Sequence, residues 1–131
     1  FLYATYLLDI AKQQGCMIVN DPETVRSANE KIFASWFPQC TPETLITTDV
    51  SLIHAFMEKH GAIIAKPLGQ MGGHGILRLS ANDPNFYSCI ELLTQNGTVP
   101  IMSQRYLPEI AQGDKRVLLI DGEAYPYALA R

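Results

Sequence analysis

The sequence predicts an α+β fold in which antiparallel strands pack with helices. Apolar residues recur at helical spacing in several segments, and two pairs of short apolar runs flank turn-forming residues, as the strands of antiparallel hairpins do. At 131 residues the chain has the size of one domain, which leaves little surplus core for a complete enzyme. We therefore expect about four helices and five to six strands, forming part of a larger protein.

The first predicted helix covers residues 1–15, because its apolar residues have helical spacing and Gly15 suits a left-handed helix end. The run CMIV at residues 16–19 is predicted to be a short strand. A second helix begins at Asp21, an N-cap residue followed by proline, and a break is predicted near Asn29. The side chains of this helix that we expect to be buried are Val25, Ile32, Phe33 and Trp36.

The middle of the chain is predicted to form a strand, a helix and a hairpin. Residues 41–48, TPETLITT, can extend as a strand, and Asp49 can cap a helix that ends at Gly61. The runs AIIAKP at residues 62–67 and GILRL at residues 75–79 are predicted to pair as antiparallel strands. Their connection is an unusually long, glycine-rich loop.

The last third of the chain is predicted to contain one helix and three strands. The helix covers residues 82–97 and ends at an Asn-Gly pair, and residues 98–107 follow as a strand. Residues 116–131 form a second hairpin, in which Asp121 and Gly122 suit a tight turn with positive φ angles.

Composition excludes several classes of protein. Ten Lys and Arg against thirteen Asp and Glu give a net charge of −3, and no basic run could follow a nucleic-acid backbone. The apolar runs are too short to cross a membrane, so we expect a cytoplasmic protein without a nucleic-acid or membrane partner. Cys16, Cys40 and Cys89 lack metal-binding spacing, which favours free thiols packed as small apolar side chains.

The glycine-rich stretch AKPLGQMGGHG, residues 65–75, is the most informative segment. It lacks the Lys-Ser or Lys-Thr pair of a Walker A loop, and a strand rather than a helix follows it, which excludes a dinucleotide fingerprint. One interpretation is a flap whose N–H groups cover phosphate oxygens while Lys66 supplies a positive charge. The alternative is that the glycines simply permit a long hairpin turn.

Two further segments carry the charged residues that a nucleotide requires. Lys31, predicted on the second helix, is either a second phosphate-binding cation or a solvated surface lysine. Asp114, Lys115 and Arg116 follow the strand exit SQRYLPEI, where free backbone groups could read an adenine edge. These three residues hold ribose and phosphate in one interpretation and form a solvated charge cluster in the other.

Taken in order, NEK, AKPLGQMGGHG, SQRYLPEI and GDKRVLLIDGE resemble the nucleotide-binding part of the ATP-grasp ligases, and most closely that of the bacterial glutathione synthetases. The resemblance covers nearly the whole chain. It implies that residues 1–20 end a substrate-binding or linker region. Residues 21–131 would then be an ATP-grasp nucleotide-binding region, incomplete at its C-terminus, with the metal ligands beyond Arg131.

The resemblance also assigns roles to individual residues. Lys31 and Lys66 would contact phosphates, Asp114 the ribose, and Arg116 and Arg131 the transferring phosphate or a substrate carboxylate. The phosphate flap would consist of Gly69, Gln70, Met71, Gly72, Gly73, His74 and Gly75. The adenine strand would consist of Gln104, Arg105, Tyr106 and Leu107. Many ATP-grasp proteins carry a glutamate in this hinge strand, and none stands here, so no acidic hinge contact is expected.

The activity implied is glutathione synthesis, in which ATP converts γ-glutamylcysteine to an acyl phosphate and glycine then displaces phosphate. ATP is the expected nucleotide, with Mg²⁺, or Mn²⁺ as an alternative, and the family suggests a homo-oligomer. The residues present here are expected to show little or no turnover alone. Two alternatives remain open: another ATP-grasp ligase for peptides or amino acids, and a nucleotide-binding module without catalysis.

Overall fold

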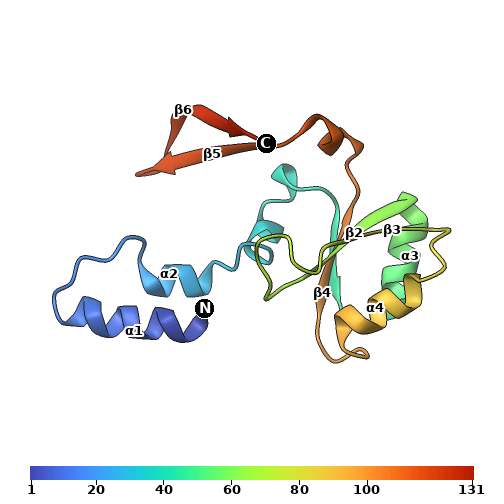
Figure 1. The fold of residues 1–131 in the computed structure, drawn as a ribbon, viewed down its shortest axis with the longest axis horizontal. Coiled ribbons are helices and arrows are strands. Elements are labelled where there is room, and N and C mark those ends of the chain that lie inside the picture. The colour runs from blue at the N-terminus through green and yellow to red at the C-terminus, as the bar shows by residue number, and fades with distance from the viewer.

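The computed structural model describes residues 1–131 and confirms an α+β fold (Figure 1). Three parts follow one another along the chain: a pair of helices, a four-stranded antiparallel sheet with two helices packed on it, and a two-stranded hairpin. In Figure 1 the hairpin lies apart from the four-stranded sheet, and a single segment of chain connects them. The predicted antiparallel sheets packed with helices are therefore present.

The helix pair consists of α1 (Leu2–Gln13) and α2 (Pro22–Ser27). The Asp21 side chain accepts hydrogen bonds from two backbone N–H groups of α2, as its predicted N-cap role requires. Arg26 of α2 holds the two helices together, because its guanidinium pairs with Asp9 at 2.5 Å and lies 4.6 Å from the centre of the Tyr6 ring.

Three predictions for this region are wrong. Residues 16–19 form no strand, because no other strand lies beside them to pair with, and Met17 is 90% exposed. The second helix ends at Ser27, which confirms the predicted break, but the chain continues as two 3₁₀ turns, η1 (Phe33–Trp36) and η2 (Pro38–Cys40). The apolar side chains here are more exposed than expected: Val25 is half-buried, while Ile32, Phe33 and Trp36 are exposed.

The four-stranded sheet has the order β1-β4-β2-β3, and every neighbouring pair is antiparallel. Its strands are β1 (Thr44–Thr47), β2 (Ala62–Pro67), β3 (Leu77–Ser80) and β4 (Ile101–Arg105). Two helices pack against it, α3 (Val50–His60) and α4 (Phe86–Thr94). Their bounds lie within the predicted segments, and the Asp49 carboxylate caps α3 by accepting two backbone N–H bonds.

The hydrophobic core lies between this sheet and its two helices. Ile53 and Met57 of α3 and Ile90 of α4 are almost fully buried against Ile63 and Ala65 of β2. Side chains alternate across a strand, and Ile63 and Ala65 face the core. Ile64 and Lys66 therefore face the opposite side of the sheet. That opposite face of the sheet carries the candidate site.

The second hairpin consists of β5 (Lys115–Ile120) and β6 (Glu123–Ala130), and the 3₁₀ turn η3 (Pro108–Gln112) precedes it. Asp121 has a φ of 52° and Gly122 a φ of 82°, which confirms the predicted turn with positive φ angles. Every residue of both strands is exposed. The hairpin is thus held mainly by its own cross-strand pairing.

The cysteines and the surface differ in part from expectation. All three cysteines are free, but Cys16 and Cys40 are exposed and only Cys89 is half-buried, so packing as small apolar side chains is wrong for the first two. Their segments lie outside the one packed core.

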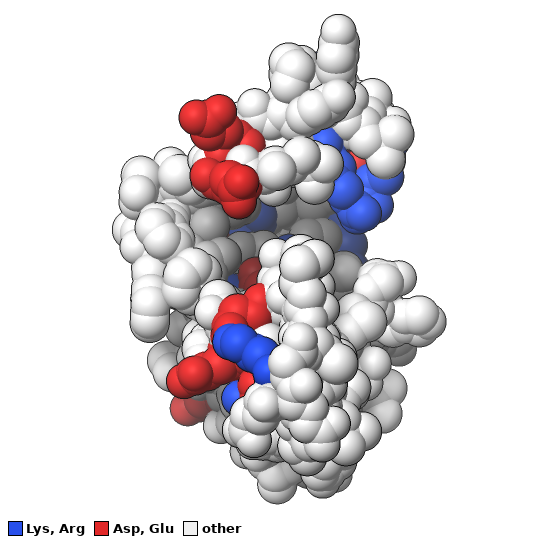
Figure 2. Space-filling view, turned by 90° about the vertical axis from the view of Figure 1, so that its left-hand side faces the viewer, with Lys and Arg blue, Asp and Glu red and all other residues white.

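Figure 2 shows acidic and basic side chains together on one face. No helix has both the length and the apolar character needed to span a membrane.

Candidate functional site

The sheet face opposite the core brings three polar side chains of different strands together. Gln104 of β4 pairs in register with Thr44 of β1 on one side and with Ile64 of β2 on the other. Lys66 lies two residues beyond Ile64 and therefore on the same face. Its Nζ donates to Gln104 Oε1 at 2.5 Å, and Gln104 Nε2 donates to Thr44 Oγ1 at 3.0 Å. The side chains thus form a hydrogen-bonded row across β2, β4 and β1.

Lys66 is the cation of this row, and two effects lower its pKa below the ordinary 10.5. Burial is the larger cause, because a half-buried ammonium loses part of its hydration. The positive charge of Lys31 is the second cause. An anion such as a polyphosphate bound near Lys66 would stabilise its charged form.

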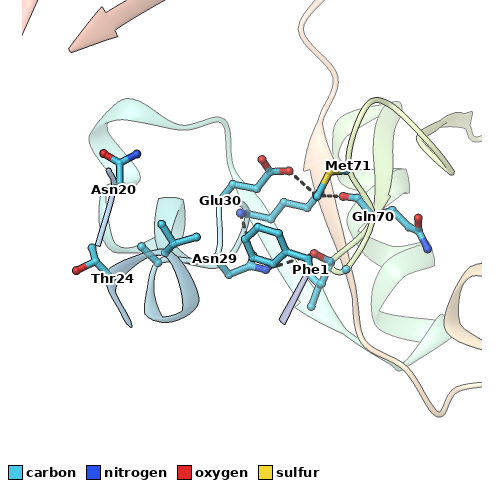
Figure 3. Close-up of a pocket in the computed structure, with 12 residues that line it drawn as sticks. Phe1, Asn20, Thr24, Asn29, Glu30, Gln70 and Met71 are labelled. Atoms are coloured by element: carbon cyan, nitrogen blue, oxygen red, sulfur yellow. Dashed lines mark hydrogen bonds and ion pairs between the residues drawn. The ribbon is translucent and has the colours of Figure 1, made fainter. Parts of the chain in front are cut away.

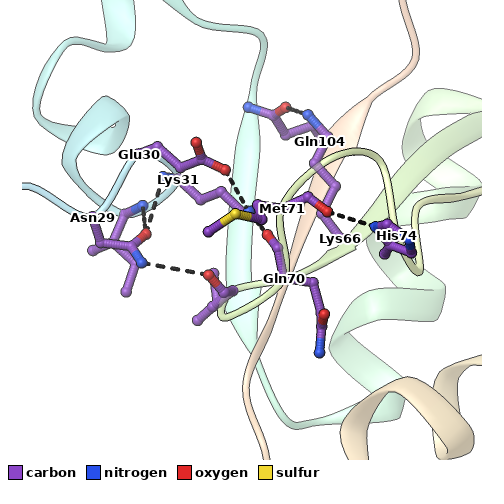
Figure 4. Close-up of polar contacts among 10 residues, drawn as sticks. Asn29, Glu30, Lys31, Lys66, Gln70, Met71, His74 and Gln104 are labelled. Atoms are coloured by element: carbon purple, nitrogen blue, oxygen red, sulfur yellow. Dashed lines mark hydrogen bonds and ion pairs between the residues drawn. The ribbon is translucent and has the colours of Figure 1, made fainter. Parts of the chain in front are cut away.

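Lys31 lies in a turn between α2 and η1, so its predicted place on a helix is wrong. Asn29 shapes this turn, because its side-chain oxygen accepts from the backbone N–H groups of Lys31 and Ile32 at 3.0 Å each. The Lys31 side chain is only 11% exposed, and its Nζ donates to the Gln70 carbonyl at 2.5 Å and to Glu30 Oε1 at 2.8 Å. The second lysine therefore reaches the glycine-rich loop directly (Figure 4).

The glycine-rich loop connects β2 to β3, and residues 69–76 of it are exposed. Gly72, Gly73 and Gly75 all have positive φ angles, of 66°, 83° and 70°. A Cβ at Gly75 would lie 2.9 Å from Pro67 Cγ, whereas one at Gly73 would meet no atom within 4 Å. His74 Nδ1 lies 2.9 Å from the Met71 carbonyl within the loop. The loop is thus fixed at its base and open to solvent above it.

A cavity of about 480 Å³ separates this loop from the helix pair. Figure 3 shows Asn29 and Glu30 between Thr24 on one side and Gln70 and Met71 on the other. Lys31 and Gly69 also line the cavity, and Asn29 Nδ2 bridges it by donating to the Leu68 carbonyl at 3.4 Å. The cavity is large enough for part of a small ligand and has a lysine in its wall.

The end of β4 presents backbone groups beside the row. The N–H of Arg105 donates to the Glu43 carbonyl at 3.0 Å and that of Tyr106 to the Ala62 carbonyl at 3.1 Å, whereas the N–H of Leu107 has no partner. The Tyr106 ring lies 4.4 Å from the guanidinium carbon of Arg78. A free N–H at a strand exit is the kind of donor that an adenine edge can accept from.

The second group of predicted residues lies at the open end of the hairpin. Asp114 and Arg131 exchange two backbone hydrogen bonds, of 3.1 and 2.9 Å, and the Arg131 guanidinium donates to both Asp114 carboxylate oxygens at 3.1 and 2.5 Å. The guanidinium lowers the pKa of the Asp114 carboxyl. Gly113 has a φ of 91°, and a Cβ there would collide with the Arg131 carbonyl oxygen. Arg116 lies exposed on β5.

The predicted residues therefore fall into two groups. The first contains Lys31 bonded to the glycine-rich loop and Lys66 bonded to Gln104, with the charge of Lys31 acting on Lys66, and the second joins Asp114 and Arg131. No hydrogen bond or ion pair connects the two groups. Sequence reasoning missed Thr44 and Asn29. The sequence does indicate a turn at Asn29, because an Asn just after a helix often shapes one. The role of Thr44 depends on a hydrogen bond to a residue 60 positions away, which no local pattern predicts.

Comparison with known proteins places the chain in a family. The family model for the prokaryotic glutathione synthetase ATP-grasp domain matches residues 30–131, and the model for the N-terminal domain of the same enzymes matches residues 1–26. The domain boundary predicted between residues 20 and 21 stays a prediction. Glutathione synthetases of Coxiella burnetii and Shewanella oneidensis are 48% and 52% identical to the chain over all 131 residues.

The chain spans about two fifths of the length of these curated relatives, 41% and 42% respectively. Among solved structures, the ATP-grasp ligase PsnB in complex with precursor peptide PsnA2 and AMPPNP has a TM-score of 0.65. It is 23% identical, and the match covers 98% of this chain and 41% of that one, which shows a shared fold. The resemblance drawn from the four sequence segments is confirmed, and the chain belongs to the prokaryotic glutathione synthetase family.

Proposed function

We propose that the chain is the nucleotide-binding part of a glutathione synthetase that joins γ-glutamylcysteine to glycine with ATP. The observation that carries the proposal is the placement of two lysines from separate elements: Lys31 donates to the Gln70 carbonyl of the glycine-rich loop, and its charge acts on Lys66 of β2. A polyphosphate bound near both lysines would stabilise the charged form of Lys66, which burial and the positive charge of Lys31 disfavour. Membership of the family and about 50% identity to glutathione synthetases support the substrates.

In the proposed reaction the terminal carboxylate of γ-glutamylcysteine attacks the γ-phosphorus of ATP, and ADP leaves. The amine of glycine then attacks the acyl phosphate, the C–O bond to phosphate breaks, and the amine proton is lost as the amide forms. Lys31 and Lys66 would neutralise charge on the phosphates during the first step. The loop from Gly69 to Gly75 would exclude water from the acyl phosphate, which water would otherwise hydrolyse.

The hairpin residues and the adenine strand complete the proposed site. Arg116 and Arg131 would hold the transferring phosphate or a substrate carboxylate, since guanidinium groups bind both in a two-pronged geometry. Asp114 is the proposed ribose contact, and the free N–H of Leu107 is the proposed donor to adenine. In the present structure Asp114 accepts from Arg131 with both oxygens, so ribose binding would require sharing that carboxylate.

The metal is the part of the proposal to which this chain contributes least. Phosphoryl transfer from ATP uses Mg²⁺ to bridge phosphate oxygens. In residues 1–131 no three His, Cys, Asp or Glu side chains gather closely enough to hold a metal ion. The location of the magnesium ligands beyond Arg131 stays a prediction, as do the use of Mn²⁺, a homo-oligomer and a cytoplasmic location.

The test is phosphate release from Mg-ATP by the full-length protein with γ-glutamylcysteine, with glycine added or withheld. Glycine-dependent release together with glutathione in the products is the expected result. Lys66→Ala should abolish most of it, whereas Lys59→Ala, a matched change of an exposed lysine on α3, should not. Residues 1–131 alone should show little or no turnover.

A second candidate is another ATP-grasp ligase, which the fold shared with a peptide-binding ligase favours. Release that depends on a different amine would replace glutathione synthesis with this alternative. Nucleotide binding without release under any pairing of substrates would instead indicate a module without catalysis.

A further inference from the structure

Gln104 stands out among the residues of the site because both ends of its side chain are engaged. Gln104 is only 9% exposed and lies on β4, the strand between β1 and β2. The oxygen Oε1 accepts from Lys66 Nζ at 2.5 Å (Figure 4), and the nitrogen Nε2 donates to Thr44 Oγ1 at 3.0 Å. A buried amide with both ends bonded is held in one orientation.

Thr44 determines which end of the amide faces the lysine. Its hydroxyl donates to the Pro42 carbonyl at 2.8 Å, so the only hydrogen of that hydroxyl is already used. The Thr44 oxygen can then only accept from Gln104, which places the NH₂ end of the amide toward Thr44. The amide oxygen must consequently point at Lys66.

We propose that Gln104 is a positioning residue for Lys66, whose ammonium it holds by an oxygen that carries no charge, so that the full positive charge remains available to a nucleotide phosphate. This inference rests on the proposed function. A carboxylate of the same length would also accept from the ammonium, but it would pair with its charge as well. It would then compete with the phosphate for the same cation.

The charges around Lys66 make this choice of side chain consequential. Lys31 acts on Lys66 from the turn before η1, and Arg78 projects from β3, the strand next to β2, with its guanidinium over the Tyr106 ring. Glu30 pairs with Lys31 at 2.8 Å and not with Lys66, whose own hydrogen-bond acceptor, Gln104, is neutral. An acidic residue at position 104 would raise the pKa of Lys66, and an apolar one would lower it further by removing the acceptor.

The test compares Gln104→Glu, Gln104→Leu and Thr44→Val in the full-length protein. The measurement is the Kd of the non-hydrolysable analogue AMPPNP across the alkaline pH range, with thermal unfolding as a check on folding. Gln104→Leu should bind the analogue about 10- to 100-fold more weakly at neutral pH, the range expected for loss of one hydrogen bond to a charged group. Gln104→Glu should also bind it more weakly, because its carboxylate competes with the phosphate for Lys66. Gln39→Glu, the same change at an exposed glutamine of η2, should leave binding unchanged.

The pH profile separates positioning from mere structural support. The pH at which affinity is lost should move upward in Gln104→Glu and downward in Gln104→Leu, because the two variants move the Lys66 pKa in opposite directions. Thr44→Val, which frees the amide to rotate, should move it downward by less. If a Gln104 variant fails to fold, the Thr44→Val shift decides the question.

Equal affinities and equal pH profiles in all folded variants would overturn the inference. Weaker binding with the same pH profile would overturn it too, since a packing role alone predicts that result. Because AMPPNP binding requires no chemistry, wild-type protein that binds the analogue but makes no glutathione would refute the proposed function and leave the Gln104 shifts as support for the inference. Absence of analogue binding by wild-type protein would overturn both.

Discussion

Replacement of Gly73 by valine would decide whether the loop between β2 and β3 is a phosphate flap or only a long connection. Gly73 has a φ of 83°, and a Cβ there would meet no atom within 4 Å, so the substitution strains the backbone without a collision. A residue with a side chain pays about 1–2 kcal/mol in this left-handed region. The loop is exposed and lies outside the core cluster, so we expect it to relax into another shape and leave the thermal midpoint unchanged.

The cost should instead fall on nucleotide binding, because closure over phosphates would require the original loop shape. A penalty of 1–2 kcal/mol corresponds to an ATP KM about 5- to 30-fold higher. The assay is glycine-dependent phosphate release by the full-length protein, combined with thermal unfolding. Gly15→Val is the matched control, because Gly15 has a φ of 90° and equally open surroundings at the end of α1.

Three results would refute this reasoning. An unchanged ATP KM in Gly73→Val would mean that the loop shape does not matter for the nucleotide. A lower thermal midpoint with an unchanged KM would mean that the glycines serve the hairpin connection. An equal rise of KM in Gly15→Val would show that the effect is not specific to the loop.

Three further predictions concern the lysine, the core and pH. Lys66→Ala should cost about 2–4 kcal/mol of transition-state stabilisation in steady-state kinetics with ATP, and an unchanged kcat/KM would remove Lys66 from the site. Ile90→Ala should lower the free energy of unfolding by about 2–5 kcal/mol in a denaturant titration. Leu92→Ala, on the same helix but 78% exposed, should change it by less than about 0.5 kcal/mol. Burial and Lys31 lower the pKa of Lys66 below 10.5, so its positive charge is lost as pH rises through that lowered value. The affinity for AMPPNP should therefore fall at a lower pH than it would with an ordinary lysine. Lys66→Arg should abolish that fall, because arginine keeps its charge.

Local sequence signals predicted much of the fold correctly. The caps at Asp21 and Asp49 and the turn at Asp121 and Gly122 depend on residues within a few positions of one another, and all are present in the structure. The strand predicted at residues 16–19 failed for the opposite reason. A strand requires a partner, and no local pattern shows whether one will lie alongside.

Part of the candidate site could be expected from the sequence, but its arrangement could not. The glycine-rich loop and Lys66 were evident because they are adjacent in sequence. The position of Lys31 against the loop, through the Gln70 carbonyl, joins residues 39 apart. The strand order β1-β4-β2-β3 places the last strand of the sheet in its interior, and sequence alone gives no physical reason for that order.

Gln104 shows why the role of a single residue depends on its neighbours in the structure. In sequence, Gln104 is only a departure from the glutamate that many ATP-grasp proteins carry there. In the structure the residue must donate to Thr44, whose hydroxyl hydrogen is already bonded to the Pro42 carbonyl, and must accept from Lys66. An ionised carboxylate accepts but cannot donate, so it would leave the Thr44 side of this row without its hydrogen bond. Glutamine is the side chain of this length that satisfies both neighbours and leaves the lysine its charge.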